Sequence, residues 1–134
     1  MRSLRKIDMI ENMAMIAVII ITLCICILPD KVLTSFSDEV MLYVERGSEA
    51  MYAENWALAE REAREVLRII EERRQGLCII VDHKHVTDML RGAKTAVQAA
   101  MLEDKSLYRE MMTVITVEVE EIREIEEMSL FVLF

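Results

Sequence analysis

Residues that build turns are scarce in this chain of 134 residues, which contains three glycines and one proline. All-β sandwiches and barrels need a turn about every 8–12 residues, so this scarcity excludes them. It also excludes collagen-like and Pro/Gly-rich disordered chains. Three cysteines are too few for a disulfide scaffold. Basic residues number 16 against 24 acidic ones, so we expect no nucleic-acid partner, because such a partner requires a basic surface.

Hydrophobic residues nevertheless make up 54% of the chain, and residues 13–28 form an apolar run without a single charge. A helix that spans a bilayer needs about 20 apolar residues, with about 17 as the lower limit. Met9 and Ile10 extend the run toward the N-terminus. We therefore predict a transmembrane helix over residues 9–28, which Pro29-Asp30 would end.

A cleaved signal peptide is the alternative for this segment. Its apolar region is usually about 7–15 residues long and is followed by small residues at the cleavage site. Here the only weak candidate for such a site is Ser35-Phe36-Ser37. The length of the run favours an anchor that is kept, so we expect a single-pass protein of the cytoplasmic membrane, in contact with the lipid bilayer.

The charges that flank the apolar run predict its orientation. Arg2, Arg5 and Lys6 precede it, whereas Lys31 is the only nearby basic residue after it. Under the positive-inside rule, residues 1–8 lie in the cytoplasm. The rest of the chain would then be outside, with a linker at residues 29–36 and a domain at 37–134.

The pattern of the outer domain predicts an all-α fold of about four helices in two antiparallel hairpins. Ser37 is a good N-cap residue, with acidic residues directly after it. Glu54-Asn55 and Glu103-Asp104 look like the turns of the two hairpins, because apolar residues recur at helical spacing on either side of each. Gly76 is a natural helix stop, and the chain from there to Asp82 would join the hairpins.

One segment of this domain fits two structures. Residues 113–119 contain six β-branched residues out of seven, and such residues prefer strands. A strand there could pair with the apolar residues 77–81. The helical spacing of apolar residues continues through Ile122 and Ile125, however, and propensity is a weak guide. We therefore favour a helix.

Residues with metal-ligating side chains cluster at one predicted helix start, and these are Asp82, His83, His85 and Asp88. His85 and Asp88 could share a helix face, but zinc needs about four ligands, or three and water, at a recognisable spacing. Capping of the helix by Asp82 is the simpler interpretation. We therefore expect no metal and no cofactor, with Asp82, His85 and Asp88 as the only weak candidates.

The remaining chemistry is sparse. Motifs for phosphate binding, nucleophilic catalysis and zinc hydrolysis are absent, so we expect no enzyme. Cys78 has no base close to it in the sequence and reads as a buried, inert thiol. A run of acidic residues near the C-terminus consists of Glu118, Glu120, Glu121, Glu124, Glu126 and Glu127. A basic partner or divalent cations would relieve the repulsion within this run, but it lacks the spacing of a calcium loop, so we expect a solvated face.

The chain resembles an uncharacterised family of small single-pass membrane proteins with a helical exported domain from spore-forming Gram-positive bacteria. The resemblance rests on Glu54-Asn55-Trp56, Asp82-His83-Lys84, Glu103-Asp104-Lys105-Ser106 and Glu127-Met128-Ser129-Leu130. These marks follow one another in order over nearly the whole chain. The resemblance implies the topology and the helix content, and it implies no activity. The chain departs from the family in its more apolar last five residues.

Two functions agree with this organisation. The first is a non-catalytic, membrane-anchored helical accessory module that binds another protein, with membrane proteins among the candidate partners. Its expected interaction surface is the wholly apolar C-terminus, formed by Leu130, Phe131, Val132, Leu133 and Phe134. The alternative is an exported domain that senses a small ligand or a metal ion through Asp82 and His85.

Overall fold

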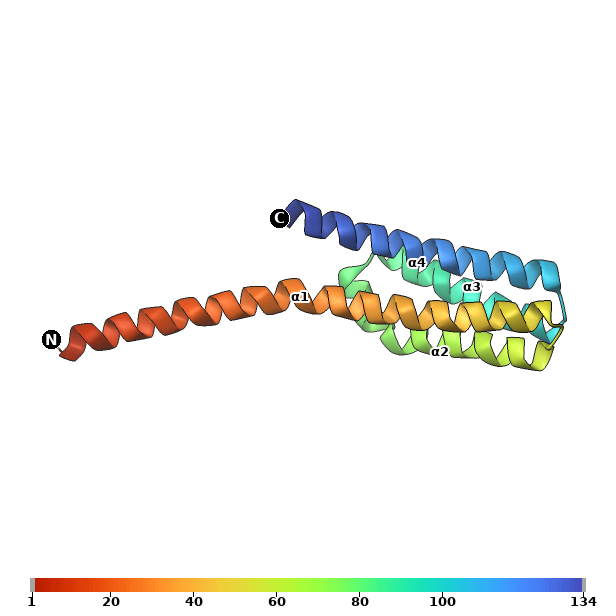
Figure 1. Cartoon of the computed structure of the whole chain (residues 1–134), viewed down its shortest axis with the longest axis horizontal. Coiled ribbons are helices and arrows are strands. Elements are labelled where there is room, and N and C mark those ends of the chain that lie inside the picture. Colours follow the sequence, from red (N-terminus) through yellow and green to blue (C-terminus); the bar gives the residue numbers. More distant parts are fainter. Residues whose placement is uncertain (1, 134) are drawn as a thin grey trace. The chain divides into compact units, whose positions relative to one another are not determined.

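The computed structural model describes the backbone of residues 2–133. It describes the side chains of that stretch except those of residues 2, 3, 26–30, 126, 129, 130, 132 and 133. The described backbone forms four α-helices and no strand, which confirms the predicted all-α class (Figure 1). The helices are α1 (Arg2–Tyr52), α2 (Trp56–Ile80), α3 (His83–Met101) and α4 (Lys105–Leu133).

The chain divides into two compact units, Met1–Val32 and Leu33–Phe134. In the first unit, Leu4–Ile25 is long and apolar enough to cross a membrane, with a mean hydropathy of 2.0. None of the side chains in this stretch is buried in the protein. A helix long and apolar enough to cross a membrane is thus present where the sequence predicts one, and it overlaps residues 9–25 of the predicted segment 9–28.

The expected break after this helix is wrong, because α1 continues without interruption through Pro29 and Ser37 to Tyr52. A proline inside a helix costs about 3 kcal/mol through its missing N–H and its steric clash. Leu33 and Phe36 are fully buried in the second unit, and each contributes about 2 kcal/mol by leaving water. Tertiary packing therefore favours a helix where local propensity favours a stop, and Ser37 is a buried interior residue rather than an N-cap.

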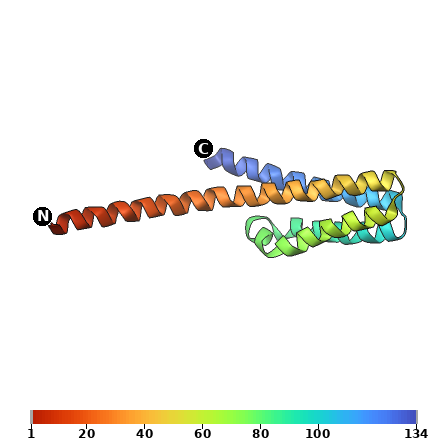
Figure 2. The same ribbon diagram turned by 60° about the horizontal axis from the view of Figure 1, so that its bottom comes forward.

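The second unit is a four-helix bundle, in which successive helices run in opposite directions (Figures 1 and 2). Its first helix is the part of α1 from Leu33 onward. The turns predicted at Glu54-Asn55 and Glu103-Asp104 are both present, and each contains a residue with positive φ, Glu54 at 57° and Glu103 at 54°. Asn55 caps α2 by accepting a hydrogen bond from the N–H of Leu58 at 3.3 Å.

Helix α2 does not end at Gly76 but continues to Ile80, so the expected stop is wrong. A side chain at Gly76 would meet no atom within 4 Å. Leu77 is buried in the core one position later, which favours continuing the helix. The N–H of Val81 bonds to the carbonyl of Leu77 and closes the last turn.

The bundle has one continuous hydrophobic core. Helix α3 carries many small buried residues, which let the neighbouring helices α2 and α4 pack closely against it. Larger side chains from all four helices fill the remaining space. The largest fully buried side chains are Tyr108, Phe36, Met51, Ile69, Ile70, Leu77, Met89, Ile115 and Ile122.

The residues 113–119, which could have formed a strand, are helical. Ile115, Val119 and Ile122 are all buried on one face of α4, and this burial outweighs the β preference of the branched side chains. The Thr116 hydroxyl donates to the carbonyl of Met112 at 2.8 Å, so it is satisfied without leaving the helix.

Tyr108 ties three helices together. Its ring meets Trp56 edge to face at 6.2 Å, and its hydroxyl donates to the buried carbonyl of Ala59 at 3.0 Å. The hydroxyl also lies against Gly47 of α1. Burial raises the pKa of Tyr108 above its usual range, and the nearby carboxylate of Glu62 raises it further.

Candidate functional site

Asp82, one of the three weak candidate ligands, is the N-cap of α3. Its carboxylate accepts a hydrogen bond from the N–H of Lys84 at 3.1 Å. Because the residue lies just before the first helical turn, this bond satisfies a donor that has no partner within the helix. The predicted capping role is confirmed.

Asp88, the second weak candidate ligand, does not join Asp82 in a common site. Its carboxylate lies 3.9 Å from the guanidinium of Arg91, one turn further along α3. Arg91 is largely exposed, so this pair is a weak surface contact. Of the three candidates, only His85 makes a side-chain contact with another helix in the described part of the chain.

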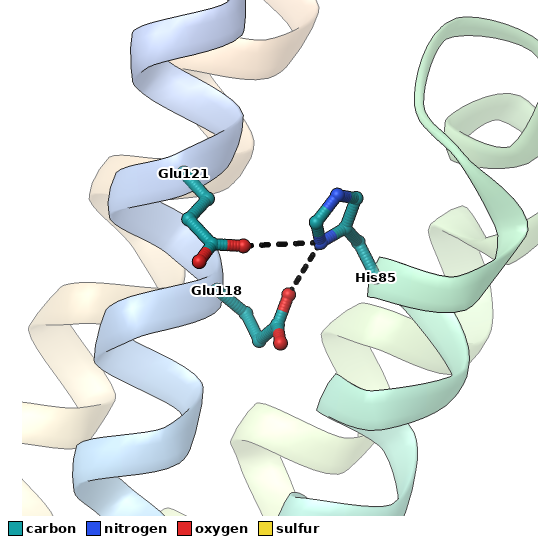
Figure 3. A group of neighbouring side chains, drawn as sticks. All are labelled: His85, Glu118 and Glu121. Atoms are coloured by element: carbon teal, nitrogen blue, oxygen red, sulfur yellow. Dashed lines mark hydrogen bonds and ion pairs between the residues drawn. The ribbon is translucent and has the colours of Figure 1, made fainter.

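His85 faces two carboxylates of α4 (Figure 3). Its Nδ1 lies 2.6 Å from Oε2 of Glu118 and 3.4 Å from Oε2 of Glu121. One ligand atom from each of the three residues lies within 4.8 Å of the others. Glu118 and Glu121 are one helical turn apart, so both can point toward the first turn of α3.

This group is partly shielded from water. The side chains of His85 and Glu118 are 22% and 14% exposed, whereas that of Glu121 is 48% exposed. A charge-assisted contact in such surroundings is stronger than on an open surface. The site is therefore a half-buried clamp between α3 and α4 with one side open to solvent.

Sequence reasoning missed the two glutamates of this clamp, because it read the whole acidic run as a solvated face. The pattern does hold one signal, since Glu118 and Glu121 share the helix face next to the buried Val119 and Ile122. Their pairing with His85 depends on the register between α3 and α4, which no local pattern contains.

Sequence reasoning also missed a partner of Cys78. Its Sγ lies 3.3 Å from Nδ1 of His83 across the α2–α3 turn, and the thiol is partly exposed. The expectation that no base is near this cysteine is therefore wrong. The turn brings together two residues that are five positions apart.

The end of α4 is apolar and exposed. Ile122 is buried, but the exposed fraction then rises to 47% at Ile125, 69% at Met128 and 87% at Phe131. These last turns of α4 project past the α2–α3 turn (Figure 1). Of the five expected surface residues, Phe131 is thus exposed, while Leu130, Val132, Leu133 and Phe134 lie outside the described side chains.

Comparison of the chain with protein-family models, curated proteins and solved structures gives no match. Functional conclusions therefore rest on the geometry and chemistry of the chain itself.

Proposed function

We propose that this chain is a non-catalytic accessory module, tethered to the outer face of the cytoplasmic membrane, whose helical bundle binds another protein. The observation that carries this proposal is the stripe at the end of α4, defined by Ile125, Met128 and Phe131. These apolar side chains follow one another at about one helical turn and are all exposed. Large exposed apolar patches are typical of interaction surfaces.

The charges beside the stripe indicate the chemistry of the partner. Glu124 and Glu127 are exposed to solvent and line the same surface groove as Met128 and Phe131. A protein segment that presents apolar residues flanked by lysine or arginine would match both features. Anionic lipid headgroups would be repelled by the same carboxylates, which favours a protein partner over the bilayer surface.

The tether supports binding at the membrane. The apolar helix Leu4–Ile25 confines the bundle to a thin layer, which raises its effective concentration toward other membrane proteins. The basic residues before the uncharged run 13–28, which are Arg2, Arg5 and Lys6, favour a cytoplasmic N-terminus and an outer bundle. Alkaline phosphatase fused to the C-terminus should therefore be active in cells, and activity from a cytoplasmic reporter alone would contradict this orientation.

The partner surface can be tested in intact membranes with a photo-crosslinking amino acid in the full chain. Placed at Phe131, it should give a discrete product with a second protein. The matched control is Leu102, which is 76% exposed and lies at the α3–α4 turn, and the same probe there should give no such product. Glu124→Lys combined with Glu127→Lys should remove the Phe131 product, because it reverses the charge beside the stripe.

Three outcomes would contradict the proposal. The product could form equally from both probe positions, it could survive the charge reversal, or the probe at Phe131 could capture lipid alone. The non-catalytic character is tested separately through the Cys78 and His83 pair. If the purified full chain turned over a substrate, and Cys78→Ala abolished that activity, the protein would be an enzyme.

A further inference from the structure

The clamp formed by His85, Glu118 and Glu121 holds an excess of negative charge. Two carboxylates face one imidazole, and a third, Glu124, follows Glu121 by three positions on α4. The nearest arginine of that helix, Arg123, is held 2.7 Å from the carboxylate of Asp38 on α1. Since like charges at this spacing repel one another, a bound cation would relieve the clamp.

We propose that the clamp is a binding site for a divalent cation of the zinc type, held by Nδ1 of His85 and one carboxylate oxygen each from Glu118 and Glu121. Zinc binds imidazole nitrogen and carboxylate oxygen at about 2.0–2.2 Å in tetrahedral geometry. Two ligand atoms of such a site lie about 3.4 Å apart, as follows from that bond length and angle.

One of the two observed distances fits this arrangement, and the other is shorter. Nδ1 of His85 is already 3.4 Å from Oε2 of Glu121. The separation from Oε2 of Glu118 is 2.6 Å, so this carboxylate must move by under about 1 Å, which a glutamate side chain can do by small rotations. Three protein ligands leave a fourth position for water, and the exposed side of Glu121 provides access to it.

The ligand set also selects among cations. Calcium and magnesium prefer oxygen ligands, usually six or more for calcium and with retained waters for magnesium. An imidazole nitrogen with two carboxylates suits zinc and its first-row neighbours instead. Because the ligands come from α3 and α4, the ion would cross-link the two helices and stabilise the folded bundle over the unfolded chain.

The test uses the untagged full chain in detergent micelles after treatment with a chelator, because a histidine tag would itself bind zinc. Zinc added to this protein should bind with a stoichiometry of one by titration calorimetry and should raise the melting temperature of the helical circular dichroism signal. Magnesium and calcium at the same concentration should leave the melting temperature unchanged.

Matched variants locate the site. Glu118→Gln and Glu121→Gln each keep the size of the side chain and remove a ligand charge, so each should weaken zinc binding at least about tenfold. Glu120→Gln changes an exposed glutamate of the same helix outside the clamp and should bind zinc as the parent does. Cys78→Ser tests the other zinc-type pair, Cys78 with His83, and should also bind as the parent does.

The proposal is overturned if zinc gives no heat of binding in the calorimeter and leaves the melting temperature unchanged. The clamp would then be a contact between His85 and the two carboxylates without a metal. It is overturned equally if Cys78→Ser loses the zinc effect while Glu118→Gln and Glu121→Gln keep it. Melting curves without metal show whether each variant is folded. If Glu118→Gln fails to fold, Glu121→Gln decides the outcome, because Glu121 is half exposed and makes the longer contact.

Discussion

A methyl group added to Gly47 would overlap the hydroxyl oxygen of Tyr108. The two residues come from α1 and α4, and the hydroxyl is held in place by its hydrogen bond to the carbonyl of Ala59. The glycine therefore allows α1 to lie directly against a buried polar group, although glycine is an unfavourable residue inside a helix.

Gly47→Ala should destabilise the bundle. Overpacking of a well-packed core lowers the free energy of unfolding by about 1–3 kcal/mol. The better helix propensity of alanine offsets about 1 kcal/mol of this loss. Gly76→Ala is the matched control, because a methyl group there meets no atom within 4 Å, and it should stabilise α2 by about 1 kcal/mol. Urea unfolding of the two variants would measure both effects, and equal shifts would contradict the close contact at Gly47.

Tyr108 should make the bundle sensitive to alkali. Its pKa is raised in the folded protein, so the folded state keeps the phenol proton that the unfolded state loses near pH 10. The stabilising contribution is therefore complete below about pH 10 and is lost as the pH rises above that value.

Tyr108→Phe should flatten the decline of stability above pH 10, at a cost of about 1 kcal/mol at neutral pH for the lost hydrogen bond. Urea midpoints at pH 8 and pH 11 would measure both effects. Tyr52→Phe is the control, because Tyr52 is 59% exposed in the folded protein, and it should leave the decline as in the parent. The same decline in Tyr108→Phe as in the parent would show that other groups cause it.

Asp82 should act through its cap rather than through its charge. Asp82→Asn keeps a good capping side chain, whereas Asp82→Ala should cost about 1 kcal/mol. Asp88→Ala is the control, because its contact with Arg91 is long and exposed, and it should cost at most about 0.5 kcal/mol. Denaturant unfolding would rank the three variants, and equal losses for Asp82→Asn and Asp82→Ala would contradict the capping role.

Features that depend only on neighbouring residues could be predicted from the sequence. The turns at Glu54-Asn55 and Glu103-Asp104 were predictable, because polar residues there interrupt two apolar stripes with helical spacing. A helix able to span a membrane was predictable from the length of the apolar run and its lack of charge. The predicted stops at Pro29 and Gly76 were wrong, because both residues are unfavourable in isolated helices while the buried Leu33, Phe36 and Leu77 beside them stabilise helix continuation.

The candidate site was only half predictable. His85 stood out as one of two histidines, but its partners Glu118 and Glu121 follow it by more than 30 residues and belong to another helix. The register between α3 and α4 decides which carboxylates lie next to His85. That register is set by the fit of the whole core, including Gly92 against Ile115, and not by residues near His85.

The helical state of residues 113–119 has a consequence for the order in which the chain folds during synthesis. Six of these seven residues are β-branched, so α4 has little intrinsic helicity before it meets α1 and α3. It is also synthesised after α1, α2 and α3. Until then, α1, α2 and α3 expose one open side of their core, and the newly made strand-prone segment is vulnerable to pairing with another chain. Helix α4 therefore completes the four-helix bundle, and a ribosome that stalls before α4 is made leaves an unfinished product exposed to quality-control proteases.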